Sequence, residues 1–376
     1  MKKYSLLLLT LFILACGNDE EDTVPNNNPS TTTTYSGLVH DTYQDHPIVV
    51  VGMSRHNFAT AYHRTLSDGT VLDFTFLRAK LPNIMEDNEG NIWNIFGIAT
   101  EGPRKGEQLK ILESYFGLWF SWSTMFPGAE IYGEVPPTVN FVPEINDPEW
   151  TIPTTNVIAV LGQDAIPSID EPVFENYDNR EFIETGEYFL DDEDVVIGVW
   201  VNDELRLYPH RILNWHEVVN DKIGDTYISV SFCPLTATSV AWERDASSSP
   251  TTFGVSGLLY NSNVIVYDRE SESLWSQMKG TAVKGNFVNE KFKQIPLIEA
   301  RWGLWKTMYE EPAVLTTDTG FGKDYTINPY ESYLETEGVL SYPVDYTDDR
   351  LPLKEKVYGV NIDGNVKVYQ FKDLIN

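Results

Sequence analysis

Residues 196–213, VIGVWVNDELRLYPHRIL, are the stretch that decides the fold. Val196–Val201 and Leu205–Tyr208 are apolar runs of strand-forming residues on either side of Asn202-Asp203, where a turn is expected. The same pattern returns in residues 357–374, VYGVNIDGNVKVYQFKDL, with Asp363-Gly364 at its centre, and Asp-Gly is a strong hairpin signal. Both stretches therefore predict a β-hairpin.

The first hairpin is followed by a predicted helix. Pro209 suits the first turn of a helix, because proline has a fixed φ and lacks the N–H that this turn leaves unpaired. Ile212, Leu213, His216 and Val219 then fall on one helical face, and residues 221–224 are expected to end the helix. Further apolar runs predict strands at Tyr227–Cys233, Ser239–Glu243, Thr252–Leu259 and Val264–Asp268, and a short helix is expected over Gly303–Tyr309.

Around the two hairpins lies a longer repeat in shifted order. Trp93, Gly97, Ala99, Gly102, Gly117-Leu118-Trp119 and Pro127 recur as Trp275, Gly280, Ala282, Gly285, Gly303-Leu304-Trp305 and Pro312. The hairpin that precedes the second copy has its counterpart at the C-terminus. We therefore expect a β-rich α+β fold with a pseudo-twofold, in which the C-terminal hairpin packs beside the N-terminal strand near Val49. Repeat one would comprise 45–134 plus 352–376, and repeat two 165–316; chance similarity among Trp- and Gly-rich strands is the alternative.

The N-terminus carries an export signal. Met1-Lys2-Lys3 and an apolar run from Leu6 to Ala15 precede Cys16, and the run is too short to span a bilayer. The ending Ile13-Leu14-Ala15-Cys16 resembles the bacterial lipobox, which implies a signal peptide over 1–15 and lipid attachment to Cys16. A plain cleaved signal peptide is the alternative.

Residues 16–34 are predicted to form a flexible acidic and Thr-rich tether, followed by a folded body over 35–376. The acidic run Asp19–Asp22 resembles a surface-export signal, although a solvated charged tail would look the same. We expect an outer-membrane lipoprotein, facing the periplasm or the cell surface. A net charge of −29 argues against nucleic acid as a partner.

Cys233 is the second of two cysteines, so with Cys16 lipidated no intrachain disulfide can form. Cys233 is a candidate nucleophile at the end of an apolar strand, with His216 as its candidate base; a buried, inert cysteine and a hydrogen-bonded core histidine are the structural alternatives. The repeat places Met53 opposite Cys233 and His56 opposite Thr236. Because thiolate, thioether and imidazole together suit copper, Cys233, Met53 and His56 are candidate metal ligands.

Five further residues are candidates for orienting a ligand: Thr236, Thr238, Asp268, Arg269 and Trp275. The hydroxyls of Thr236, Thr238 and Ser239 would otherwise satisfy the backbone, and Asp268-Arg269 would otherwise fix a turn as an ion pair. Tryptophans 119, 122, 302 and 305 are expected to be core residues rather than sugar platforms. No phosphate-binding glycine loop, HExxH, paired CxxC or nucleophile elbow occurs in the sequence.

Three stretches together resemble the bacterial DUF3179 family over roughly residues 165–315: YPHRILNWHEVVND at 208–221, FCPLTAT at 232–238, and FGVSG at 253–257 with the residues to Gln277. The resemblance implies no activity. Some members have a second cysteine three residues after the first, and Thr236 stands there in this chain, so a dithiol mechanism within the motif is excluded.

The sequence therefore leaves two functions open. The first is a binding or scaffolding lipoprotein that meets a glycan, a peptide or an envelope protein. The second is a thiol-dependent enzyme or a copper-handling protein with a pocket around Cys233.

Overall fold

The structure is a computed structural model that describes residues 33–139, 141–178, 188–245 and 250–375. Cys16, the predicted signal peptide and all but the end of the predicted tether lie outside these residues. The described chain is rich in β-strands and contains few, short helices, as expected for a β-rich α+β fold. No helix in this part of the chain is long and apolar enough to cross a bilayer.

The two predicted hairpins are the centres of two sheets. Val195–Val201 (β12) and Glu204–Pro209 (β13) pair antiparallel, and so do Lys356–Ile362 (β24) and Asn365–Tyr369 (β25). Asn202 and Asp203 have φ values of 52° and 62°, and Asp363 and Gly364 of 53° and 84°. Such left-handed pairs match the twist of the flanking strands, which explains the Asn, Asp and Gly at these turns.

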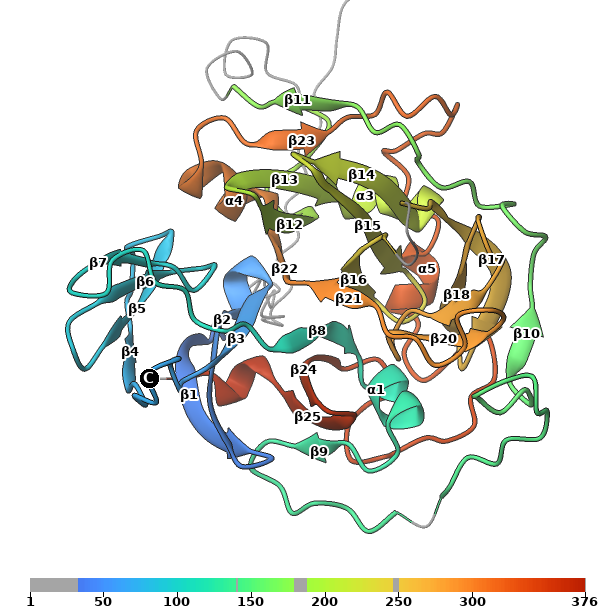
Figure 1. The fold of residues 1–376 in the computed structure, drawn as a ribbon, viewed down its shortest axis with the longest axis horizontal. Helices are drawn as coiled ribbons and strands as arrows, with labels where there is room; N and C mark the ends of the chain where they lie inside the picture. The colour runs from blue at the N-terminus through green and yellow to red at the C-terminus, as the bar shows by residue number, and fades with distance from the viewer. Residues whose placement is uncertain (1–32, 140, 179–187, 246–249, 376) are drawn as a thin grey trace, which may run out of the picture. The chain divides into compact units, whose positions relative to one another are not determined.

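Each hairpin is extended in the same way. On one side β12 pairs antiparallel with Leu297–Arg301 (β22), and β24 pairs antiparallel with Glu113–Leu118 (β8). On the other side β13 runs parallel to Ala313–Leu315 (β23), and β25 runs parallel to Glu130–Ile131 (β9). The C-terminal hairpin therefore lies beside β8 of the first half (Figure 1). The shared strand order is what a duplication would produce, although the duplication itself stays a prediction.

The remaining strands form four more sheets within the described residues. Their orders are β1-β2-β3, β4-β5-β6-β7, β14-β15-β16-β21 and β10-β17-β18-β19-β20, and Phe174–Asn176 (β11) joins β23. Their bounds are Ser36–Tyr43 (β1), His46–Met53 (β2), Phe58–His63 (β3), Phe74–Phe76 (β4), Asn83–Asp87 (β5), Ile92–Asn94 (β6), Ala99–Glu101 (β7), Val157–Ala159 (β10), Val218–Ile223 (β14), Thr226–Cys233 (β15), Thr238–Glu243 (β16), Phe253–Tyr260 (β17), Asn263–Asp268 (β18), Leu274–Ser276 (β19), Thr281–Lys284 (β20) and Lys293–Ile295 (β21).

The helices are Trp119–Met125 (α1), His210–His216 (α3), Trp302–Met308 (α4) and Glu331–Glu335 (α5), with 3₁₀ turns at Ser54–His56 (η1) and Phe371–Asp373 (η2). The prediction that the helix after Pro209 continues to residues 221–224 was wrong. It ends at His216, and Val218–Ile223 pairs with β15 instead. The consecutive β-branched residues Val218 and Val219 favour a strand over a helix.

The tryptophans of the two short helices show that the alignment of Gly117-Leu118-Trp119 with Gly303-Leu304-Trp305 was shifted by three residues. Trp119 begins α1 as Trp302 begins α4, whereas Trp305 lies one turn into its helix, as Trp122 does. A Cβ on Gly198 would lie 2.3 Å from the Trp305 ring, and a Cβ on Gly359 would lie 2.3 Å from the Trp122 ring. Each hairpin therefore needs a glycine where a tryptophan packs on it, and all four helix tryptophans are core residues.

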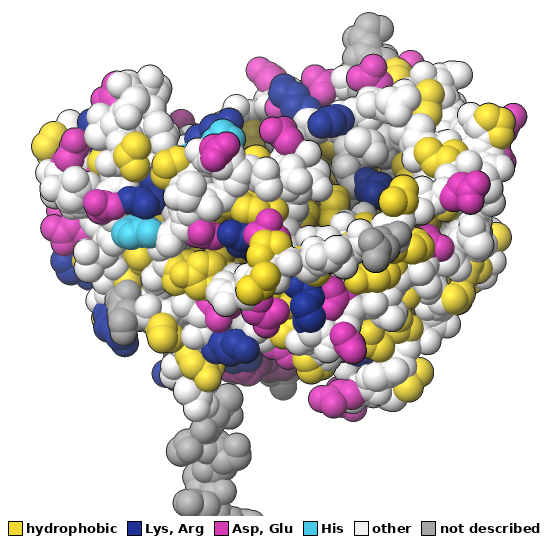
Figure 2. Space-filling view, turned by 90° about the horizontal axis from the view of Figure 1, so that it is seen from below, with side chains coloured by type: hydrophobic (Ala, Val, Ile, Leu, Met, Phe, Trp, Pro, Cys, Tyr) yellow, Lys and Arg dark blue, Asp and Glu magenta, His cyan; other side chains and the backbone are white. Residues whose placement is uncertain are grey.

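The C-terminal hairpin also covers the first sheet of the chain. Tyr358, Val360 and Tyr369 share a hydrophobic cluster with Ile48 and Val50 of β2, together with Ala59, Ala61, Leu112, Phe116, Ile362 and Leu374. The C-terminal hairpin thus packs near Val49 as expected, but through the neighbouring residues Ile48 and Val50. Val49 itself points to the opposite face of β2 and belongs to another cluster. On the surface seen in Figure 2, acidic and basic side chains are interspersed.

Candidate functional site

Cys233 lies at the end of β15 and is 1% exposed, with its Sγ 3.9 Å from the carbonyl oxygen of Ser262. Burial raises the pKa of the thiol to about 11, and the nearby carboxyl of Glu217 adds to the shift. A thiol with this pKa is protonated at neutral pH, so these surroundings do not produce the thiolate that a nucleophile requires.

His216 is fully buried at the end of α3, and both of its ring nitrogens have partners other than Cys233. Nδ1 lies 2.7 Å from the carbonyl oxygen of Pro167, and Nε2 lies 2.7 Å from the Tyr325 hydroxyl. A carbonyl only accepts, so Nδ1–H donates to Pro167 and Nε2 accepts from Tyr325. Burial lowers the pKa of His216, which favours this neutral form. The structure therefore does not bring the His216 imidazole to the Cys233 thiol as its base.

The candidate metal ligands are separated. Met53 pairs with Phe58 just as Cys233 pairs with Thr238, but the two side chains belong to different hydrophobic clusters. His56 lies in η1, after Met53, and burial lowers its pKa. Within the described residues, no group of three or more His, Cys, Asp or Glu side chains could hold a metal ion.

Thr236 and Thr238 belong to a buried network of side chains. Their hydroxyls lie 2.9 Å apart, Thr238 donates to Gln277 over 2.7 Å, and the Asn263 amide donates to Thr236, Thr238 and Gln277. Ser239 donates to Glu299 over 2.6 Å. The interpretation that these hydroxyls satisfy the backbone was wrong, because they bond to side chains of β18, of the turn after β19 and of β22.

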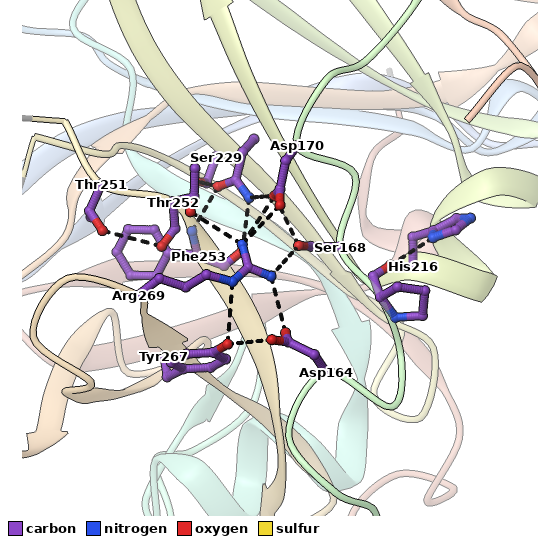
Figure 3. Close-up of polar contacts among 12 residues, drawn as sticks. Asp164, Ser168, Asp170, His216, Ser229, Thr251, Thr252, Phe253, Tyr267 and Arg269 are labelled. Carbon is purple, nitrogen blue, oxygen red and sulfur yellow. Dashed lines mark hydrogen bonds and ion pairs between the residues drawn. The ribbon is translucent and has the colours of Figure 1, made fainter. Parts of the chain in front are cut away.

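Asp268 and Arg269 act separately rather than as an ion pair with each other. Asp268 accepts from the backbone N–H of Ser271 and from Nε1 of Trp275, and so fixes the turn after β18. Arg269 points the other way, toward the segment before β11 (Figure 3). Neither Asp268 nor Trp275 is exposed, and both are engaged in the core.

Arg269 holds the segment 164–170 against β17 and β18 (Figure 3). Its Nη1 lies 3.1 Å from both carboxylate oxygens of Asp170, and its Nη2 lies 3.1 Å from Asp164 and 2.9 Å from Ser168. The Tyr267 hydroxyl also donates to Asp164, over 2.5 Å. A guanidinium with several of its donors engaged positions the chain, and here it fixes the segment that carries Ile166.

Ile166 lines an apolar pocket of about 330 Å³, a volume within the range of small-molecule sites. The wall contains residues of β17 and β18, the segment 160–166 and the aromatic residues of 329–342. The lining side chains are mostly hydrophobic: Val160, Leu161, Ile166, Leu235, Val255, Leu258, Leu259, Val264, Pro329, Tyr330, Tyr333 and Tyr342, with Glu217 among them. Leu161 is 49% exposed and marks a side open to solvent.

Glu217 is the one acidic side chain among these lining residues, and its backbone is fixed in an unusual conformation. It follows α3 with a φ of 57°, its N–H donates to the Leu213 carbonyl, and its own carbonyl accepts from the N–H of Phe232. A residue other than glycine is seldom left-handed, and such strain is found at functional sites. These two bonds turn the chain from α3 into β14 and hold the carboxyl at the pocket.

The Glu217 carboxyl is buried with one weak partner, the Tyr330 hydroxyl at 3.5 Å. No Lys, Arg or His of the described chain forms an ion pair with it. Burial therefore raises its pKa to about 7, far above the ordinary value for glutamate. At neutral pH this group can both donate and accept a proton, which makes the apolar pocket a site with one adjustable polar group.

Tyrosines from α5 and the preceding turn close this pocket. The Tyr333 hydroxyl donates to the Leu235 carbonyl over 2.9 Å, and Lys354 lies 3.6 Å above the Tyr333 ring. Burial raises the pKa of Tyr330, with a further contribution from Glu217. Tyr330 therefore stays protonated and can donate to the carboxyl.

Sequence reasoning did not single out Glu217, although it lies next to His216 in the motif that carries the family resemblance. A detectable signal existed, since a glutamate stands between an apolar helix face and the apolar strand Val218-Val219. The tyrosines of 330–342 gave no signal, because their segment has no periodic pattern.

Fold and site define a β-rich α+β protein with a ligand-sized apolar pocket and a buried carboxyl. Residues 163–376 match the family described as "Protein of unknown function (DUF3179)". Since this is more than half of the chain, the protein belongs to the DUF3179 family. No curated protein and no solved structure matches the chain significantly.

Proposed function

We propose that this protein is a binding lipoprotein of the outer membrane, anchored through a lipid on Cys16 and facing the periplasm or the cell surface. Its ligand is a small, mainly apolar molecule that carries an amine or a hydroxyl group. The lipobox-like ending Leu14-Ala15-Cys16 after an apolar run supports the anchor. The observation that carries the ligand class is the buried Glu217 carboxyl, without a cationic partner among the described residues, at an apolar pocket.

The chemistry of the pocket selects for a hydrogen-bond donor. A buried carboxylate is costly unless a cation or several donors stabilise it, and Tyr330 supplies one donor at 3.5 Å. A bound amine would supply both charge and hydrogen bonds, and its apolar body would contact the leucines and valines. A ligand carboxylate would instead place two acids together, which is unfavourable.

Two probes of the same shape test this proposal: 4-phenylbutylamine and 4-phenylbutyrate, titrated calorimetrically into the full chain. We expect the amine to bind and the acid to bind at least tenfold more weakly at pH 8. Amine binding should weaken about tenfold at pH 6, because Glu217 must then lose a proton. Glu217→Gln should abolish both the preference and the pH dependence, whereas Glu335→Gln on the exposed face of α5 should change neither. Equal binding of amine and acid would contradict the proposal.

A second candidate is an enzyme that uses Glu217 as general acid and base, since a pKa of about 7 suits that role at neutral pH. Glu217 raises the pKa of the nearby Cys233 thiol, so a thiol-dependent activity within this candidate would require Glu217 or a bound ligand to accept the thiol proton. Turnover of a bound amine or alcohol that is lost in Glu217→Gln would favour the enzyme over the binding protein.

A further inference from the structure

Two histidines lie side by side on the first sheet of the chain. His46 begins β2 and His63 ends β3. Ile48 pairs with His63 across these strands, and His46 precedes Ile48 by two residues, so both imidazoles project from the same face of the sheet. Their ring centres are 5.2 Å apart and their planes are inclined by 82°. The two strands therefore hold two side chains that can ligate a metal in contact with each other.

The ring nitrogens of this pair are not used to hold the fold together. The buried His216 bonds through both of its nitrogens, whereas neither His46 nor His63 has a hydrogen-bond partner on its ring within the described chain. His46 is exposed and His63 is half-buried. Burial lowers the pKa of His63 to about 4, with contributions from Lys110 and His46, so this imidazole is neutral at pH 7 and keeps a lone pair for a ligand.

The spacing of the two rings suits one shared metal ion. A metal–nitrogen distance of about 2.0–2.1 Å and a tetrahedral angle put the centres of two bound imidazoles about 5 Å apart. The backbone of each histidine is fixed by strand pairing, whereas the exposed His46 ring can turn about its side-chain bonds until both rings direct a nitrogen to the same point. The pair therefore needs no movement of the backbone to bind an ion.

The charged neighbours limit the ligands to the two imidazoles. Lys110, whose carbonyl accepts from the N–H of His63, opposes a cation, but its side chain is exposed and long enough to turn away. Asp41, on the same face of the sheet, is bonded to a lysine and a tyrosine of β25. Asp45 is exposed in the turn before β2. Within the residues that the structure describes, no third His, Cys, Asp or Glu completes the pair.

We infer that His46 and His63 form a binding site for a transition-metal ion, with the two imidazoles as protein ligands and water in the remaining positions. Imidazole suits Cu²⁺, Zn²⁺ and Ni²⁺, and Cu²⁺ binds such ligands most tightly. Ca²⁺ and Mg²⁺ require oxygen ligands, which this pair lacks. A net charge of −29 favours cations around the chain. The open positions distinguish this site from a closed structural one.

Titration of CuCl₂ into the full chain at pH 7 tests the inference, with electron paramagnetic resonance to count the nitrogen ligands. His46→Ala and His63→Ala should each weaken copper binding at least tenfold and remove one nitrogen from the spectrum. Lys110→Met should strengthen binding, because it removes the positive charge beside the pair. His40→Gln is the control and should change neither result, because His40 pairs with Val49, whose side chain lies on the opposite face of the sheet.

Two results would overturn the inference: unchanged copper affinity in a folded His46→Ala variant, or a spectrum of the parent chain with fewer than two imidazole nitrogens. If His63→Ala does not fold, His46→Ala decides the matter alone, because its side chain is exposed and its loss leaves the core intact. Neither result depends on the pocket at Glu217.

Discussion

At the scale of single residues, Glu217 shows how one backbone angle defines a site. Its φ of 57° ends α3, starts β14 and directs a carboxyl into apolar surroundings. Three neighbours, Tyr330, Cys233 and Leu235, leave it little solvent and few donors. This geometry is sufficient to raise the pKa of Glu217 to about 7, so that the carboxyl is partly ionised at neutral pH.

The burial of Glu217 makes a prediction about stability. Because its pKa is raised when the chain folds, the contribution of Glu217 is fully present below pH 4.5 and is lost as pH rises through about 7. By pH 8 the loss is on the order of 3 kcal/mol. Glu217→Gln should thus be more stable than the parent at pH 8 but not at pH 5, as measured by urea unfolding. An equal effect at both pH values would argue against a buried ionisable carboxyl.

Cys233 gives a second prediction at this scale. Its burial and its pKa of about 11 predict that a maleimide modifies the native chain at least a hundredfold more slowly than the urea-unfolded chain. Labelling followed by mass spectrometry measures both rates. Fast native labelling that a bound amine blocks would instead show an accessible thiol at the pocket and favour the enzyme candidate.

At the scale of elements, the two hairpins depend on glycines against tryptophan rings. A methyl group on Gly359 would overlap Trp122, and the ring is buried between sheets and cannot move away cheaply. Gly359→Ala should cost about 1–3 kcal/mol of unfolding free energy. Gly162→Ala, where nothing lies within 4 Å, is the control and should cost less than about 0.5 kcal/mol. Equal costs would mean that the helix and hairpin separate readily.

An element could be predicted from the sequence where local residues determine it, and could not where contacts with distant residues determine it. The hairpins at 196–209 and 357–369 were predictable because Asn-Asp and Asp-Gly define their turns locally. The end of α3 was not, since Val218 and Val219 become a strand only by pairing with β15. Glu217 lies at that boundary, so the error about the helix also concealed the site. The partners of His216 and Arg269, 49 to 109 residues away in sequence, gave no local signal.

At the scale of the whole molecule, an ion pair joins the sheet of β22 to the sheet of β24. Glu299, which is buried, accepts from Ser239 and lies 3.4 Å from Lys356 Nζ and 3.8 Å from His210 Nε2. Lys356 and His210 lower the pKa of Glu299 despite its burial, and burial lowers the pKa of His210 to about 4. The contact between the two sheets is therefore an ion pair between the Glu299 carboxylate and Lys356, beside a neutral His210.

Because Glu299 and His210 lie at this contact between the sheets, we expect the fold to be sensitive to acid. Both pKa values are lowered on folding, so the contribution of His210 is present above pH 6.5 and is lost as pH falls toward 4, followed by that of Glu299 below its ordinary pKa of 4.5. Glu299→Gln should lower the unfolding free energy at pH 7 by about 2–3 kcal/mol, since Lys356 is partly exposed. A double-mutant cycle with Lys356→Met should show coupling between the two substitutions. Independent effects would mean that the ion pair does not stabilise the fold.

The pairing of β24 with β8 has a consequence for the nascent chain during synthesis. Strand β8 is synthesised more than two hundred residues before its neighbour in the sheet, and until β24 arrives one of its edges has no partner. An unpaired edge is prone to join other chains. Completion of the sheet that contains β8 must therefore wait until residues 356–369 have left the ribosome. A premature stop codon before residue 356 would affect strands at the opposite end of the chain and expose them to aggregation.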